Sequence, residues 1–184
     1  MTAYAIALFC HFVGMVGLFV GYGLEWTATS LLRRAKTSDQ ARFALSLYRQ
    51  SMPISGPGLL ILILSGGYLA SRTGAMRQGW ISGALLGIVF ALGIGFVFVL
   101  PRIRTMRAAI PEGSAPLAAP ALTRVNDPMV VTFIRIRFMV GLGIVVLMTS
   151  KPQLLTTALF VLLGGIVVGL LCAATVWTRS PQPA

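Results

Sequence analysis

Long apolar runs alternate with short polar segments along the chain. The apolar runs cover about residues 3–26, 53–70, 80–100, 128–149 and 152–177. A helix that crosses a bilayer needs roughly 20 apolar residues, and each run approaches that length. The pattern predicts an all-α protein, a polytopic transmembrane helix bundle with about five spans. The second run is the shortest and contains Pro53 and Pro57, so we expect it to be kinked or to be completed by residues before Pro53.

Two of the polar segments predict structure of their own. Around residues 38–50, a Ser-Asp-Gln start precedes a segment that could divide into an apolar and a basic face, which predicts a short helix in the cytoplasmic interface. The segment of about 108–127 is rich in Ala and Pro and is expected to be an irregular, flexible cytoplasmic loop. At its end, Asp127 is predicted to cap a helix that has Pro128 in its first turn.

Basic residues gather on one side of the predicted membrane. Of the 15 Lys and Arg residues, all but Arg72, Arg77 and Lys151 lie in the regions after the first, third and fifth spans or at the start of the fourth. Because cytoplasmic segments are enriched in Lys and Arg, the N-terminus is expected outside and the C-terminus in the cytoplasm. We interpret the chain as a multi-pass protein of the bacterial inner membrane.

Glycines recur at the spacing of helix-packing motifs. GxxxG pairs are formed by Gly17 and Gly21, by Gly83 and Gly87, and by Gly165 and Gly169. Such pairs let helix backbones approach closely within a bilayer. We favour packing within the monomer, and the alternative is a homodimer or a membrane-complex partner joined through these glycine faces.

The composition agrees with one integral membrane domain over residues 1–184. Hydrophobic residues make up 57% of the chain and charged residues 10%, and the mean hydropathy is +0.87. The net charge of +11 lies at the ends of apolar runs, where it fits lipid headgroups and argues against nucleic-acid binding. The chain has only four acidic residues, which argues against a hydrolase or an ion pump that depends on several carboxylates.

His11 is the only histidine and lies within the first predicted span. At 100° per residue, His11, Met15, Leu18, Tyr22 and Glu25 follow one side of that helix, so the stripe is expected to face inward. One interpretation makes His11 an axial ligand to a haem iron, with Met15 and Tyr22 beside the cofactor. The other makes it a structural histidine that donates one hydrogen bond to a neighbouring helix.

The ligand interpretation leaves the second axial position open. The chain offers Met15, Met76 and Met139 as candidates, or His11 of a second copy. Copper is an alternative metal, because Cys10, His11 and Met15 are soft or borderline ligands close in sequence. Cys10 and His11 nevertheless project about 100° apart on a helix, which weakens a shared copper site.

Glu25 is expected to have a structural role as one partner of a buried ion pair. It lies near the predicted inner boundary of the first span, and Arg135 and Arg137 enter the fourth span from the same side. Pairing with either arginine would lower the cost of burying the carboxylate.

Three passages resemble a known group of proteins. CHFVGMVGLFVG, SGPGLLILILSGGYLAS and QGWISGALLGIVFAL look like a family of small bacterial integral membrane proteins of unknown function. More distantly, the early histidine and the glycine-rich pattern are similar to CopD-like and HemJ-like membrane proteins. The HemJ resemblance implies b-type haem, and it carries that ligand role only onto His11.

Three functional hypotheses follow. The first is a haem-associated or redox-accessory membrane protein that uses His11. The second is a non-catalytic accessory or assembly subunit of a membrane complex. The third is copper or small-solute transport.

Overall fold

A computed structural model describes residues 2–177 and shows an all-α bundle. The helices are α1 (Ala3–Leu32), α2 (Ser38–Arg72), α3 (Gly79–Gly93), α4 (Leu100–Ala109), α5 (Ala119–Val125), α6 (Pro128–Ser150) and α7 (Leu155–Trp177). A short 3₁₀ turn, η1 (Ala75–Arg77), precedes α3, and a π-helical segment, η2 (Ile94–Val99), joins α3 to α4. Arg179 and the C-terminal residue lie outside the described residues.

Five helical stretches are long and apolar enough to cross a membrane. They are Ala3–Leu32, Ser38–Arg72, Gly79–Ala109, Ala119–Ser150 and Leu155–Thr175. The predicted all-α bundle with five spans is therefore confirmed, and the chain is a multi-pass membrane protein. Its sidedness stays a prediction from the distribution of charge.

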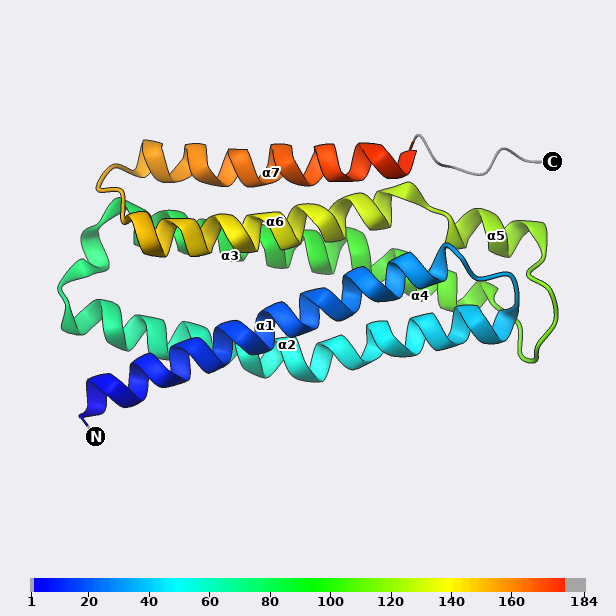
Figure 1. The fold of residues 1–184 in the computed structure, drawn as a ribbon, viewed down its shortest axis with the longest axis horizontal. Coiled ribbons are helices and arrows are strands. Elements are labelled where there is room, and N and C mark those ends of the chain that lie inside the picture. The colour runs from blue at the N-terminus through cyan, green and yellow to red at the C-terminus, as the bar shows by residue number, and fades with distance from the viewer. Residues whose placement is uncertain (1, 178–184) are drawn as a thin grey trace.

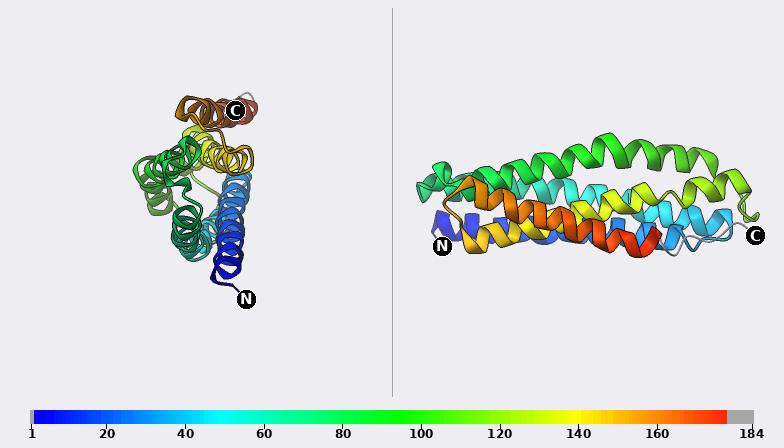
Figure 2. Two further views of the ribbon diagram at one scale, coloured as in Figure 1. Left: turned by 90° about the vertical axis from the view of Figure 1, so that its left-hand side faces the viewer. Right: turned by 90° about the horizontal axis from the view of Figure 1, so that it is seen from above.

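The bundle consists of an α1–α2 pair and a group formed by α3, α6 and α7 (Figure 1). The view along the bundle in Figure 2 shows α6 between the α1–α2 pair and α7. The connections 73–78 and 151–154 lie at the same end as the N-terminus, which we call the outer end. The connections 33–37 and 110–118 lie at the opposite, inner end.

The segment 38–50 is not a separate interfacial helix, because it continues without a break into the second span as α2. Its buried positions keep a helical spacing across Pro53, from Ala41 and Tyr48 to Ser51 and Ser55. This stripe packs inside the bundle, so the segment contributes to the core instead of lying on the membrane surface. Membrane helices tolerate internal proline when neighbouring helices support the backbone.

The segment 108–127 has more structure than an irregular loop. Its middle forms an isolated antiparallel bridge between Thr37 and Pro116, with a hydrogen bond from Leu117 N to Lys36 O at 3.1 Å. Leu117 is buried in the core, and α5 follows it. As predicted, the Asp127 side chain caps α6, accepting from Met129 N at 2.9 Å.

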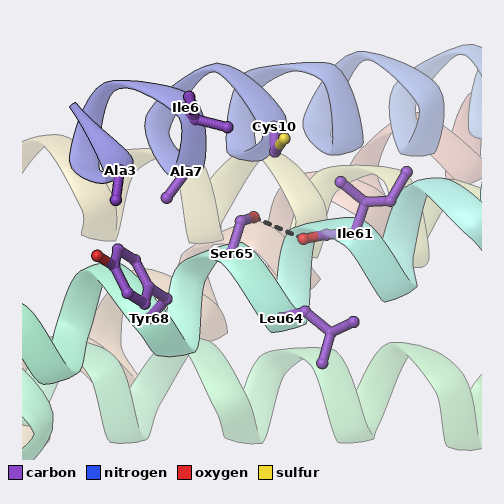
Figure 3. A pocket seen from close by; sticks show the side chains of 8 residues that line it. All are labelled: Ala3, Ile6, Ala7, Cys10, Ile61, Leu64, Ser65 and Tyr68. Carbon is purple, nitrogen blue, oxygen red and sulfur yellow. Dashed lines mark hydrogen bonds between the residues drawn. The ribbon is translucent and has the colours of Figure 1, made fainter. Parts of the chain in front are cut away.

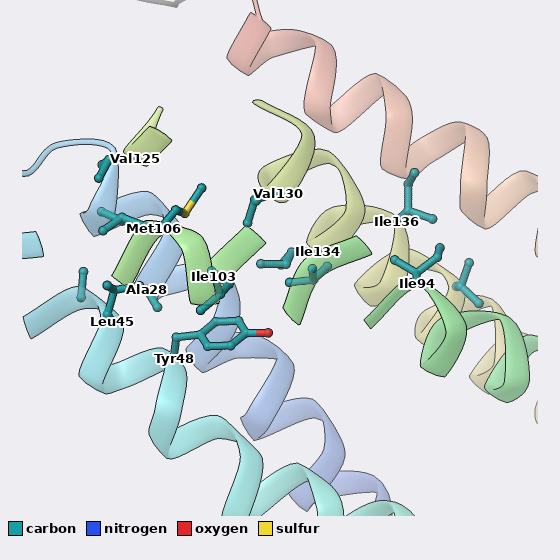
Figure 4. Close-up of a cluster of buried hydrophobic side chains, with 14 of the residues drawn as sticks. Ala28, Leu45, Tyr48, Ile94, Ile103, Met106, Val125, Val130, Ile134 and Ile136 are labelled. Carbon is teal, nitrogen blue, oxygen red and sulfur yellow. The ribbon is translucent and has the colours of Figure 1, made fainter. Parts of the chain in front are cut away.

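The main apolar core includes only the inner part of the α1–α2 pair. Figure 4 shows Tyr48, Ile103, Met106, Val130 and Ile134 converging there. The outer parts of α1 and α2 form a much smaller cluster around Leu18, Tyr22 and Leu62. We call residues 25–51 the inner part of the pair, and residues 3–22 and 55–72 its outer part.

Candidate functional site

Glu25 and Arg137 form a buried ion pair between α1 and α6. Arg137 Nη1 donates to Glu25 Oε2 at 2.7 Å, and the side chains are 10% and 3% exposed. The Ser51 hydroxyl of α2 lies 3.5 Å from the other carboxylate oxygen. Since a lone charge in hydrocarbon is costly, this pairing makes the burial of both groups tolerable.

The Arg137 guanidinium is enclosed on two more sides. Its carbon atom Cζ lies 5.0 Å from the centre of the Tyr22 ring, a cation–π geometry. On another side it packs against Gly95, where an added Cβ would lie 3.1 Å from Arg137 Cζ. We call Tyr22, Glu25, Ser51, Gly95 and Arg137 the ion-pair cluster. It joins α1, α2, η2 and α6.

The π-helical segment has a local cause in the sequence. Pro101 is the second residue of α4, and a proline ring clashes with the carbonyl group four residues before it. A π-helical turn widens the helix and accommodates such a disturbance without ending it. Gly95 lies within this segment, so the guanidinium meets a helix surface that has no side chain.

Arg135 does not pair with Glu25. Its guanidinium carbon lies 4.9 Å from the centre of the Trp26 ring, and its Nη1 donates to the carbonyl oxygen of Cys172 on α7. Of the two arginines considered as partners of Glu25, only Arg137 makes the contact. Arg135 instead links α6 to α7.

His11 faces α2 from the outer part of α1. Its Nδ1 lies 3.2 Å from the Leu62 carbonyl oxygen and 3.3 Å from Ser65 Oγ. A carbonyl oxygen only accepts, so the contact with Leu62 fits the neutral tautomer in which Nδ1 carries the ring hydrogen and Nε2 has the lone pair. The ring lies against Gly66, where a Cβ would be 3.0 Å from His11 Cε1.

The stripe predicted on α1 does face the neighbouring helices. Leu18, Tyr22 and Glu25 are buried, and His11 and Met15 are partly buried. Met15 packs against the small cluster of Leu18, Tyr22 and Leu62. His11 and Glu25 are separated by roughly 21 Å along the helix, given a rise of about 1.5 Å per residue. They therefore belong to two different environments.

The side chains of Cys10 and His11 point to different sides of α1. Cys10 lines an open groove of about 430 Å³ between α1 and α2 (Figure 3), together with Ala3, Ile6, Ala7, Ile61, Leu64, Ser65 and Tyr68. The groove does not include His11 or Met15. Within residues 2–177, no three His, Cys, Asp or Glu side chains come together as a metal site.

The three GxxxG pairs pack against helices of the same chain. A Cβ at Gly21 would lie 2.4 Å from Ser55 Cβ, one at Gly83 2.6 Å from Ala158 Cβ, and one at Gly169 2.7 Å from Ile136 Cα. Their partner glycines Gly17, Gly87 and Gly165 meet the same neighbouring helices, α2, α7 and α6. These glycines therefore close the monomer, in agreement with the interpretation favoured from the sequence.

Sequence reasoning missed Ser51, Gly95 and the buried position of Tyr48. Tyr48 belonged to the interfacial helix predicted at about 38–50 and was therefore expected at the membrane boundary, and Ser51 lies between that segment and the predicted second span. The three-residue spacing from Tyr48 to Ser51 and the four-residue spacing to Ser55 could have indicated one inward face. Nothing in the local sequence of Gly95 indicates its contact with Arg137, because that contact joins residues far apart in the chain.

Comparisons of the chain with models of known protein families, with curated proteins and with solved structures gave no significant match.

Proposed function

We propose that this membrane protein is haem-associated, with His11 as the axial ligand of a b-type haem in a redox-accessory role. The observation that supports the proposal is the hydrogen bond from His11 Nδ1 to the Leu62 carbonyl oxygen at 3.2 Å. Histidine ligands commonly donate from one ring nitrogen to a backbone carbonyl and bind the metal through the other. The contact therefore orients a neutral imidazole and leaves Nε2 as the ligand atom.

The residues around His11 fit this role. The imidazole is partly buried, and its Cε1 and Nδ1 atoms lie against Gly66. The side chains of Met15, Leu18 and Leu62 lie farther along the same interface. An apolar environment suits a macrocycle that is itself mostly apolar. When bound, haem supplies one-electron chemistry. The protein tunes the reduction potential of haem through the axial ligand and the hydrogen bonds of that ligand.

The second axial position is not filled from α1. Met15 lies one turn from His11 on the same face of the helix, so both side chains would approach an iron atom from the same side. Two axial ligands must approach from opposite sides. A second protein ligand would therefore come from Met76 or Met139 or from His11 of another copy of the chain.

An absorption spectrum of the purified protein in detergent, after expression with added haem precursor, tests the proposal. We expect a Soret band in the wild-type protein and in Cys10→Ala, and loss of the band in His11→Ala. His11→Gly should regain the band when imidazole is added, which separates loss of the ligand from loss of the fold. A colourless wild-type protein, or a Soret band that persists in His11→Ala, would contradict the proposal.

A further inference from the structure

A second site lies at the inner end of the bundle, far from His11. It is a hollow of about 650 Å³ between α2 and α4. Its lining consists of Arg42, Leu45, Ser46, Arg49, Arg104, Arg107, Ala108, Ile110 and Glu112. Four arginines from two helices thus surround one hollow.

The arginines share this hollow because of helical spacing. Arg42 and Arg49 are seven residues apart on α2, two turns along one face, and Arg104 and Arg107 are three residues apart on α4. Leu45 and Ile110 are buried and contribute apolar surface between them. The positive charges are therefore held together by two packed helices and are not spread over a loop.

Acidic side chains compensate little of this charge. Glu112 is the only acid in the lining of the hollow; its carboxylate lies 3.4 Å from Arg42 Nη2, and its side chain is 93% exposed. An ion pair this exposed contributes little. Within residues 2–177, Arg49, Arg104 and Arg107 form no ion pair with an acidic side chain. An anion that enters the hollow would meet several guanidinium groups at once.

From this arrangement we propose that the hollow binds a phosphate-bearing anion. Guanidinium groups bind phosphate oxygens through two parallel hydrogen bonds, which is why clustered arginines favour phosphate over a simple halide. The location at the end of membrane helices fits the phosphodiester of an anionic lipid headgroup, and basic pockets between such helices are known lipid sites. A free phosphate compound offers the same chemistry from the aqueous side.

The test uses the full chain in nanodiscs of phosphatidylcholine, with short-chain phosphatidylglycerol and inorganic phosphate as separate probes. Binding is measured for the wild type, for Arg104→Gln/Arg107→Gln, and for the control Arg34→Gln/Arg124→Gln. The control removes the same charge from exposed positions at the same end that do not line the hollow. Far-UV circular dichroism verifies that each variant keeps its helices.

We expect the pocket variant to weaken phosphate-group binding by at least about tenfold, the effect of losing one charge-assisted hydrogen bond. The control should change it less than about threefold. Arg104→Lys/Arg107→Lys should bind with intermediate strength, because it keeps the charge and loses the paired donors. Saturable binding of phosphatidylglycerol alone would assign the site to a lipid headgroup, whereas binding of inorganic phosphate would assign it to a soluble anion. Equal weakening in the pocket and control variants, or no saturable binding of either probe, would overturn the proposal.

Discussion

In the inner part of the α1–α2 pair, Glu25 is almost fully buried and paired with Arg137 at 2.7 Å. In the outer part, His11 is only partly buried, and its polar contacts with the described residues 2–177 are made through Nδ1. Both side chains lie on the same face of one helix. The difference comes from the neighbours, because the main core includes the inner part of the pair and not the outer part.

This comparison separates two uses of a polar group inside a membrane. The charges in the ion-pair cluster compensate each other, and Tyr22, Ser51 and Gly95 enclose them. Such a cluster links α1, α2, η2 and α6, and it has little capacity for a ligand. His11 keeps a free ring nitrogen in a less crowded environment. The contrast agrees with a structural role for the inner cluster and with the ligand role that we propose for the outer histidine.

The largest effect is expected from breaking the inner ion pair on one side. Arg137→Met leaves Glu25 buried without its counter-ion, and such a change costs about 3–5 kcal/mol of unfolding free energy. The measurement is an unfolding titration in mixed micelles followed by circular dichroism. The matched control is Arg102→Met, which removes the more exposed pair with Asp127 at 3.4 Å and should cost less than about 1 kcal/mol. Equal losses would show that burial of the inner pair has no energetic consequence.

A smaller effect is expected from separating α1 and α2 in their outer part. A Cβ at Gly14 would lie 2.7 Å from the Gly58 carbonyl oxygen and from Leu62 N. Gly14→Ala must therefore move one backbone away from the other, at a cost of about 1–3 kcal/mol. Gly23→Ala is the control on the same helix, since a Cβ there meets nothing within 4 Å. The close approach of the helices would be refuted if the two variants unfolded alike.

The smallest effect on stability is expected at His11 itself. His11→Ala removes a hydrogen bond to Leu62, and hydrogen bonds between membrane helices contribute on average about 0.6 kcal/mol. The same unfolding titration should therefore show only a small loss of stability for His11→Ala, the variant that we expect to lack the Soret band. A loss as large as that of Arg137→Met would instead give His11 a structural role and remove the contrast between the two parts.

The spans and the contact of Glu25 with Arg137 could be predicted from the sequence because both depend on simple rules. Apolar length identifies a membrane helix, and a buried acid needs a basic partner at a similar depth. The helical spacing on α1 likewise placed His11 and Tyr22 on the inward stripe. Local signals were also sufficient for the cap formed by Asp127.

The sequence allowed residues before Pro53 to complete the second span, as they do in α2, but it did not predict that this helix begins as early as Ser38. The basic residues of 38–50 favour a position at the membrane surface, whereas the buried stripe from Ala41 to Ser51 depends on contacts with distant segments. The segment around Leu117 is ordered by a bridge to Thr37 and by burial in the core, and neither follows from its Ala- and Pro-rich composition. Gly95 meets Arg137 only because η2 and α6 pack together.

The most direct test of the structural contrast is the unfolding free energy of the double variant Glu25→Leu/Arg137→Met, compared with its two single variants. Each single variant leaves one buried charge alone, whereas the double variant leaves none. Replacing both partners of a buried pair by apolar residues is often nearly neutral. We therefore predict that the double variant regains most of the stability lost in either single variant. If the two losses instead add to within about 0.5 kcal/mol, the residues are not coupled, and the inner cluster does not join the helices as described.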